Sequence, residues 1–166
     1  MKTLLIYDSK RGGTKAIVEM ISKELTYQHT RIPINEFSED NISDYDQILF
    51  AAPTYAGNLR KSASEFLEEK CPLLKMKRLF LVNTGIQFEQ EKINTQLNSV
   101  FPEDLRNHAI TTVFLGGICR IPDMNFFEKM ILKKVFSDND VAFNGKETYR
   151  QIDSKKIDAL INMMSQ

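Results

Sequence analysis

Short apolar runs alternate with amphipathic helical patterns along most of this 166-residue chain. Between the runs, apolar side chains recur at three- and four-residue spacing, as in Ile17, Met20 and Ile21, which is typical of helices with one buried face. Strands that alternate with helices in this way form a parallel sheet with helices on both faces. We therefore predict a doubly wound, three-layer α/β/α fold with five parallel strands in the order 2-1-3-4-5. The predicted strands span about Lys2–Asp8, Thr30–Ile34, Gln47–Ala52, Arg78–Asn83 and Ala109–Gly116.

The chain length favours one domain over residues 1–166. Two prolines mark expected ends, because proline lacks the N–H that a ladder or a helix needs. We expect Pro53 to end the third strand and Cys71-Pro72 to close the following helix. An irregular or helical insertion is expected at about 118–149, with a polar loop over Ser137–Tyr149. Its apolar stripe, Phe127 to Val135, is more typical of core than of a quinone-binding or membrane surface.

The loop after the first apolar run is made of small, hydroxylated and basic residues. Two adjacent glycines let backbone N–H groups crowd one point, and the helix that starts here directs its N-terminal N–H groups and its dipole at the same point. Hydroxyl and cationic side chains add further donors. A capped turn is the alternative, but this combination favours a phosphate site. The candidate ligands are Ser9, Lys10, Arg11, Gly12, Gly13 and Thr14.

Two further loops follow the third and fourth strands, at the same edge of the predicted sheet. Right-handed crossovers place a crevice between strands one and three, where ligands of doubly wound folds bind. A phosphate at the first loop and a planar group between the other two predict a mononucleotide. Each later loop, taken alone, is also an ordinary turn. The candidate residues here are Pro53, Thr54, Tyr55, Ala56, Gly57, Asn58, Asn83, Thr84 and Gly85.

Other proteins with related strand orders are excluded because the residues that they need are missing. A phosphorelay receiver requires an aspartate at the end of the third strand, where this chain has Ala51-Ala52-Pro53. A nucleoside triphosphatase requires a glycine-lysine-serine/threonine loop, and a dinucleotide fold requires Gly-x-Gly-x-x-Gly. A low-molecular-weight tyrosine phosphatase requires a cysteine in the first loop. None of these patterns occurs here.

The charge balance and the cysteine content exclude several classes of partner and site. Lysine plus arginine equals aspartate plus glutamate, at 22 each, which argues against a general nucleic-acid binder. Cys71 and Cys119 are too few and too far apart for a disulfide scaffold or a zinc motif, so we expect free thiols in a reducing compartment and no metal site. No apolar run approaches about 20 residues, so no transmembrane segment is expected. We predict a cytoplasmic protein.

The three loops together resemble the flavodoxin family. The residues that carry the resemblance are Ser9–Thr14, Pro53–Asn58 and Asn83–Gly85, within a similarity that extends over about Met1–Gly117 and fits the last helix. The resemblance implies FMN, held non-covalently, with Ser9, Arg11, Gly12, Gly13 and Thr14 at its phosphate. It places Thr54, Tyr55, Gly57 and Asn58 along one side of the isoalloxazine, and Thr84 and Gly85 along the other. Arg11 departs from the family, which often has threonine there.

Two weaker resemblances indicate which kind of molecule accepts electrons from the flavin. Pro53–Asn58 is similar to the flavodoxin-like quinone reductases. The start of the chain, with Gly116-Gly117 followed by Arg120, Pro122, Phe126, Phe127 and Lys129, resembles the flavodoxin-like menaquinone-linked protoporphyrinogen oxidases. They imply an oxidoreductase with a quinone or porphyrinogen-type acceptor, and leave peripheral membrane contact open. The alternatives are an electron shuttle to redox protein partners, with acids of Glu36–Asp46 as a docking rim, and a non-catalytic FMN-binding regulatory domain. Candidates for chemistry beyond electron transfer are Tyr55, Asn58 and Arg120.

Overall fold

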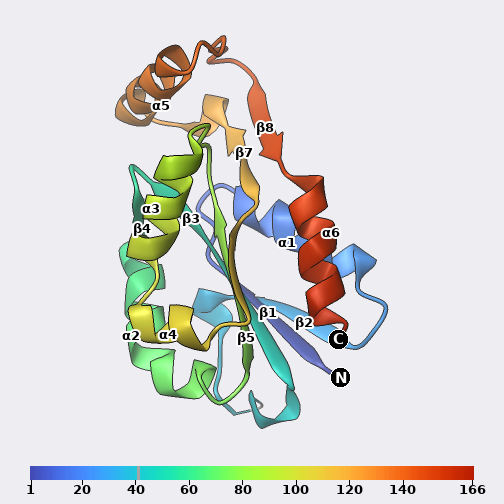
Figure 1. Ribbon diagram of the computed structural model, residues 1–166. Helices are drawn as coiled ribbons and strands as arrows, with labels where there is room; N and C mark the ends of the chain where they lie inside the picture. Colours follow the sequence, from blue (N-terminus) through green and yellow to red (C-terminus); the bar gives the residue numbers. More distant parts are fainter. Residues whose placement is uncertain (41) are drawn as a thin grey trace.

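A computed structural model describes residues 1–40 and 42–166 of the chain. Its centre is a sheet in which five parallel strands follow the order β2-β1-β3-β5-β6 (Figure 1). This order confirms the predicted doubly wound fold, because the chain builds toward one edge through β2 and then, from β3 onward, toward the other. The strands are β1 (Thr3–Tyr7), β2 (His29–Pro33), β3 (Gln47–Tyr55), β5 (Arg78–Thr84) and β6 (Thr111–Phe114).

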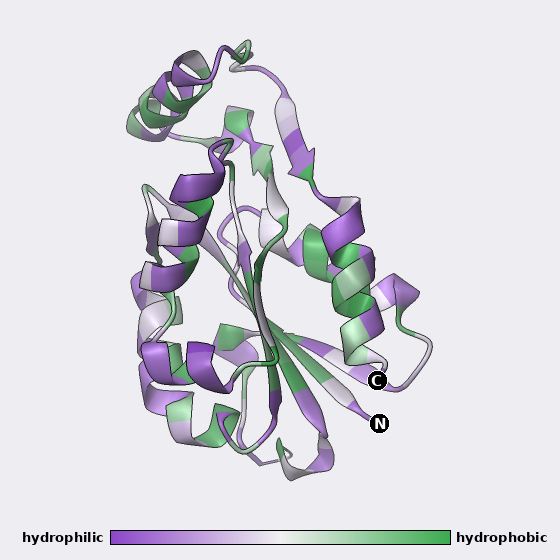
Figure 2. Cartoon of the chain, in the orientation of Figure 1, coloured by the Kyte–Doolittle hydropathy of each residue, from purple (hydrophilic) through white to green (hydrophobic). Residues whose placement is uncertain are grey.

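Helices cover both faces of the sheet (Figure 1). One face carries α1 (Gly13–Glu24) and α6 (Ser154–Met164), and the other carries α2 (Lys61–Leu74), α3 (Gln90–Val100) and α4 (Glu103–His108). Alternation along β1 shows how the strands serve both layers, since Leu4 and Ile6 pack toward α2 whereas Leu5 packs toward α1. Figure 2 shows the hydrophobic residues gathered in the strands, between the helix layers. The first crossover after β2 contains two short 3₁₀ helices, Ile34–Glu36 and Ile42–Asp44.

Neither proline ends its element, so both of these predictions were wrong. β1 stops at Tyr7, opposite Ala51, and β3 beyond that point has a parallel neighbour only on the β5 side. Pro53 therefore lies in an edge-like part of the strand, where a missing N–H is tolerated. β3 continues to Tyr55 and pairs antiparallel with β4 (Asn58–Leu59). Pro72 lies in the last turn of α2, where the carbonyl that it leaves unbonded belongs to the exposed Glu68 and can be hydrated.

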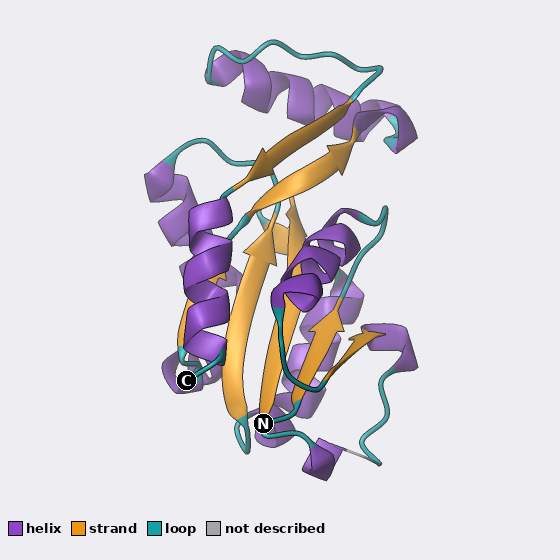
Figure 3. Cartoon of the chain, turned by 90° about the vertical axis from the view of Figure 1, so that its right-hand side faces the viewer, coloured by secondary structure: helices purple, strands orange, loops and turns teal. Residues whose placement is uncertain are grey.

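The chain from Gly116 to Ile152 differs most from expectation. The fifth parallel strand ends at Phe114, and a separate strand, β7 (Gly116–Arg120), pairs antiparallel with β8 (Thr148–Ile152). Between them lie a 3₁₀ turn (Ile121–Asp123) and α5 (Phe126–Asp138), which carries the apolar stripe of the sequence, whereas β8 begins at Thr148, within the polar loop expected over Ser137–Tyr149. Figure 3 shows this ribbon and helix beyond the carboxyl ends of the sheet strands. The pairing joins segments about thirty residues apart, which no local periodicity reveals.

A separate apolar cluster fixes α5 above the sheet. Phe136 is fully buried, and the rings of Phe88, Phe143 and Tyr149 meet it edge-on, with centroids 5.7, 5.6 and 4.6 Å away. Leu132 packs into the same cluster one helical turn earlier. Aromatic pairs in this geometry contribute about 0.5–1.5 kcal/mol each beyond their buried area. α5 is therefore a packed element of the fold, held at the edge where the predicted site lies.

Candidate functional site

A cleft of about 340 Å³ opens beyond the carboxyl ends of β1, β3 and β5. It lies at the point where the winding of the sheet reverses, as expected for a ligand site in this fold. All three loops singled out in the sequence contribute to its lining, together with β7 and α5. Of the candidate residues, the cleft lining includes Ser9, Arg11, Gly13, Thr14, Thr54, Tyr55, Ala56, Gly57, Thr84, Gly85 and Arg120. The others, Lys10, Gly12, Pro53, Asn58 and Asn83, lie outside this lining.

The first loop has the backbone that an anion site needs. Gly12 has a left-handed φ of 79° and stands at the N-cap of α1, where it has no side chain to cap the helix. Ser9 Oγ accepts from the backbone N–H of Lys15 at 3.3 Å, which leaves the N–H groups of Gly13 and Thr14 in the first turn for a ligand. Gly13 is required for a different reason, because a Cβ there would lie 2.2 Å from the carbonyl oxygen of Ile118 in β7. The two glycines thus shape the loop and admit the ribbon that covers it.

Buried hydrogen bonds connect the three loops. The hydroxyls of Thr14 and Thr84 lie 2.9 Å apart and link the first loop to the third. The amide of Gln96 in α3 donates to the Thr54 hydroxyl at 2.8 Å and to the Asn83 side chain. Asn83 in turn donates to the carbonyl of Ala52 at 3.0 Å. Gln96 was missed in the sequence, where it is one polar residue of an amphipathic helix, but here it joins the second loop to the third.

The second loop is a tight hairpin. Tyr55 pairs with Asn58, and the two residues between them have positive φ, 48° at Ala56 and 81° at Gly57. This is the backbone of a type I′ turn, which matches the twist of the flanking strands. Asn58 donates to the carbonyl of Ala56 at 3.3 Å, so its side chain braces the turn. The candidate Asn58 is exposed and lies outside the cleft lining, whereas Tyr55 lines the cleft.

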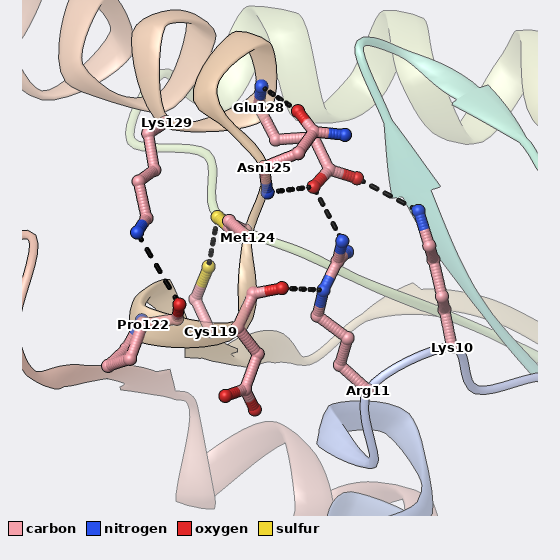
Figure 4. Close-up of polar contacts among 9 residues, drawn as sticks. Lys10, Arg11, Cys119, Pro122, Met124, Asn125, Glu128 and Lys129 are labelled. Carbon is pink, nitrogen blue, oxygen red and sulfur yellow. Dashed lines mark hydrogen bonds and ion pairs between the residues drawn. The ribbon is translucent and has the colours of Figure 1, made fainter.

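Glu128 of α5 holds the two cations of the first loop (Figure 4). One carboxylate oxygen lies 3.0 Å from Lys10 Nζ, and the other lies 2.5 Å from Arg11 Nη2. Arg11 Nε also donates to the carbonyl of Asp123 at 2.9 Å. The basic side chains of the loop are therefore turned toward the segment between β7 and β8. Glu128 was missed in the sequence, although Asn125-x-x-Glu128 is the spacing of a capping box and the structure contains that box.

The same contacts set the charge of Glu128. Partial burial opposes ionisation, but the backbone N–H of Asn125 and the Lys10 and Arg11 side chains outweigh it and lower the pKa of Glu128 to about 2. The carboxylate is therefore charged at neutral pH. With one acid facing two cations, the first loop keeps a net positive charge toward the cleft. Arg11 supports this directly, because its buried Nη1 has no hydrogen-bond partner among the described residues.

A family model of the flavodoxin domain matches residues 4–142, which is most of the chain. The chain belongs to the flavodoxin domain family. Protoporphyrinogen IX dehydrogenase [quinone] of Escherichia coli K12 is 22% identical over 142 residues, covering 81% of this chain and 78% of the relative. An archaeal flavodoxin structure superposes with a TM-score of 0.54 at 16% identity, over 83% and 95% of the two chains. Two-electron reduced Megasphaera elsdenii flavodoxin gives 0.51 at 19% identity, over 69% and 82%.

FMN is the cofactor of the flavodoxin family, and the residues of this cleft fit it. The first-turn N–H groups of Gly13 and Thr14, and Arg11 Nη1, which has no hydrogen-bond partner among the described residues, suit a phosphate dianion. Gly57 leaves open space beside the hairpin, where a side chain would otherwise stand. The volume falls in the usual range of about 300–1,000 Å³ for small-molecule sites. The chain therefore has both the polar end and the open slot that this family requires.

In this flavodoxin-domain protein, an apolar wall lines the cleft next to the first loop. Met124, Ile131, Leu132 and Val135 line the cleft from the segment between β7 and β8. Cys119 of β7 lines it too, and burial raises the pKa of this thiol to about 11, so it stays protonated at neutral pH. The stripe from Phe127 to Val135 was predicted to be core, but most of it is exposed or lines the cleft, so this prediction was wrong. The stripe lies over the cleft because β7 and β8 pair and carry α5 there.

Asp8 is a second acid that the sequence analysis passed over. It stands at the end of β1, is 4% exposed and contacts Arg60 at 2.7 Å. Burial raises the pKa of Asp8, and the charge of Arg60 partly offsets that rise. Burial likewise raises the pKa of Tyr55, whose ring lies 5.9 Å from Lys10 Nζ. The Asp8–Arg60 pair ties the end of β1 to the start of α2, beside the second loop.

Two negative findings concern the part of the chain that the structure describes. No helix among residues 1–40 and 42–166 is both long and apolar enough to cross a bilayer. Over the same ranges, no three His, Cys, Asp or Glu side chains stand together in a way that would hold a metal ion.

Proposed function

We propose that this protein is an FMN-dependent oxidoreductase that transfers electrons between the reduced flavin and an organic acceptor of quinone or porphyrinogen type. The observation that carries the proposal is the cleft itself, where the cationic first loop at the start of α1 adjoins an apolar wall from α5. The similarity to a quinone-linked protoporphyrinogen IX dehydrogenase supports this choice of acceptor. An apolar wall favours a flat organic partner, which gains free energy by leaving water.

The chain's own residues have separate tasks in this proposal. The first loop binds the phosphate through backbone N–H groups, the Thr14 region and Arg11 Nη1. The Thr14–Thr84 and Gln96–Thr54 hydrogen bonds keep the three loops at a constant separation. Apolar side chains of α5 exclude water from the slot and offer a surface to the acceptor. Bound FMN would supply the redox chemistry. Tyr55 and Arg120, which both line the cleft, stay candidates for contacts with the acceptor.

An electron shuttle that docks on protein partners is the alternative. It needs a charged rim around the cleft, and the acids of the first crossover were the candidates. Asp44 and Asp46 instead lie beside Lys2, at the start of β1 and away from the cleft. Glu39 is paired with Lys70 at 2.7 Å. These contacts remove most of the expected rim, so the geometry favours the organic acceptor over the shuttle. A non-catalytic FMN-binding regulatory domain stays the second alternative.

Two measurements test the proposal in sequence. Purified protein should show the visible bands of bound flavin, or acquire them when FMN is added, and riboflavin should bind far more weakly because it lacks the phosphate. After anaerobic reduction, a water-soluble menaquinone analogue should reoxidise the flavin rapidly in stopped flow, and oxidation of protoporphyrinogen should be measured in parallel. Protein that ignores FMN contradicts the cofactor assignment. Protein that binds FMN but passes electrons only to redox proteins favours the shuttle.

We also propose that the protein works in a reducing compartment, the cytoplasm. Cys71 and Cys119 are both free thiols, and each is partly buried rather than paired. Survival of both thiols in protein purified without reductant would support this location, and a stable intermolecular disulfide would argue against it.

A further inference from the structure

The outer side of α5 exposes an unusual concentration of large apolar side chains. Phe126 and Phe127 are 71% and 73% exposed, and Met130 and Ile131 are 54% and 51% exposed. The other exposed large apolar residues lie away from α5: Met20 is on α1, and Met1, Met76 and Ile110 precede the first residues of β1, β5 and β6. Isolated exposed apolar residues are normal on protein surfaces, but a contiguous group marks a surface that meets a partner or a membrane.

Helix geometry places these residues on one face. An α-helix turns once every ~3.6 residues, so Glu128, Leu132 and Phe136 share the inner side, where Leu132 and Phe136 are buried. Phe126, Phe127, Met130, Ile131 and Lys134 fall on the opposite side. Figure 2 shows hydrophobic segments on this helix, which stands clear of the sheet and its two helix layers. The residues on the outer side are therefore exposed because the inner side is the one that packs against the rest of the protein.

Apart from Asp138 in its last turn, the exposed charged residues of this helix are lysines. Lys129, Lys133 and Lys134 lie among or beside the apolar residues. Of the two acids, Glu128 is engaged by Lys10 and Arg11, and Asp138 is at the far end of the helix. No lysine of α5 forms an ion pair with a described acidic residue within 4.0 Å. Lys129 Nζ instead donates a hydrogen bond to the carbonyl of Pro122. Apolar side chains with lysines around them are the composition of helices that lie in a lipid–water interface.

The apolar face also continues into the cleft. Ile131 is half exposed and lines the cleft, and Leu132, the next residue, and Val135, one helical turn on, line it too. A molecule dissolved in the acyl region could therefore pass from the outer face of α5 to the cleft along apolar side chains. This continuity sets the orientation of the protein on any surface that α5 meets.

We propose that the outer face of α5 docks onto the surface of an anionic lipid bilayer, with Phe126 and Phe127 inserted below the headgroups and Lys133 and Lys134 at the phosphates. The basis is the charge of this face and its continuity with the cleft. Docking presents the mouth of the cleft to the bilayer. Its use, delivery of a lipid-soluble acceptor, rests on the proposed function, whereas the docking itself does not.

Vesicle co-sedimentation tests the proposal on full-length, FMN-loaded protein. The vesicles are phosphatidylcholine alone, or equimolar phosphatidylcholine and phosphatidylglycerol, and contain no quinone. We expect binding to the anionic vesicles that weakens as salt rises, because screening reduces the lysine contribution. Phe126→Ser combined with Phe127→Ser should lower the partition coefficient at least tenfold. Lys133→Glu combined with Lys134→Glu should abolish the preference for anionic vesicles.

The matched control replaces exposed apolar residues elsewhere, Met76→Ser with Ile110→Ser, and should bind vesicles like the unmodified protein. Thermal midpoints and FMN content of every variant check that folding is retained. The proposal fails if the unmodified protein does not sediment with anionic vesicles, if it binds neutral vesicles equally well, or if the Phe126/Phe127 variant binds unchanged. A concentration-dependent dimer that this variant abolishes would assign the face to a second copy of the chain.

The outcome is separable from that of the proposed function. If the unmodified protein does not bind vesicles but a soluble menaquinone analogue still reoxidises its flavin, the docking alone is overturned. If the unmodified protein binds vesicles but the analogue does not reoxidise its flavin, the proposed acceptor is overturned and the docking surface stands.

Discussion

The Glu128 carboxylate of α5 lies 2.5 Å from the Arg11 guanidinium of the first loop, although 117 residues separate them in the chain. The contact joins the first loop, the candidate phosphate site, to the helix that forms the apolar wall of the cleft. Both side chains are mostly buried, at 16% and 21% exposed, so solvent screens the pair less than it screens an ordinary surface ion pair. The position of α5 and the charge of the loop are therefore coupled.

A double-mutant cycle measures this coupling. We expect Arg11→Gln and Glu128→Gln each to lower the free energy of unfolding, and the two together to cost less than the sum. The interaction free energy should be about 1 kcal/mol, the upper end for exposed pairs, because the pair is partly buried and hydrogen-bonded. Urea denaturation of the four proteins gives the cycle. Lys61→Gln with Glu65→Gln, an exposed pair on α2, is the control and should give a smaller coupling. Additive effects at Arg11 and Glu128 would contradict the coupling.

The contribution of Glu128 should depend on pH in a defined direction. Its pKa in the folded protein is lowered from 4.5 to about 2, so the ionised form is the one that folding favours. The stabilisation is complete above about pH 4.5 and is lost as pH falls toward 2. The stability difference between the unmodified protein and Glu128→Gln should therefore be constant above pH 5 and shrink below it. A difference that grows on acidification would have the wrong sign.

Gly13→Ala should destabilise the protein through a steric clash. The new Cβ would lie 2.2 Å from the backbone oxygen of Ile118, and a backbone atom cannot move aside as a side-chain end can. We expect a loss of about 1–3 kcal/mol in the free energy of unfolding, typical of overpacking, and weaker FMN binding. Gly145→Ala is the matched control, because its Cβ would make only ordinary contact at 3.5 Å. Equal stability of the two variants would show that β7 does not press on the loop.

Thr14 and Thr84 form a buried hydroxyl pair at 2.9 Å, so either single change to valine leaves one hydroxyl without its partner. Each of Thr14→Val and Thr84→Val should cost about 1–2 kcal/mol of unfolding free energy. The double variant should cost less than the sum of the two, since no unpaired hydroxyl remains. Chemical denaturation measures the stabilities, and FMN titration reports whether the loops keep their spacing. Strict additivity would mean that the hydrogen bond contributes little.

Cys119 should be a slow nucleophile. Burial raises its pKa from 9.0 to about 11, which lowers the thiolate fraction near neutral pH about 100-fold. In a Cys71→Ser variant, iodoacetamide should alkylate Cys119 at least tenfold more slowly in the folded protein than in urea, as followed by mass spectrometry. The denatured sample of the same variant is the control. Equal rates in the two states would indicate that the thiol is open to solvent.

The sequence by itself determined the doubly wound sheet and the three loops at its carboxyl edge, because strand and helix patterns and glycine-rich turns are local features. It did not reveal Gln96, Asp8 or Glu128 as parts of the site, since each acts through a partner distant in the chain. Only the tertiary structure decided that β7 and β8 pair, and that this ribbon carries α5 over the cleft. The physical reason is that a buried face of a helix or strand repeats apolar residues at a regular spacing in the sequence. The pairing of two strands across a long connection produces no such repeat.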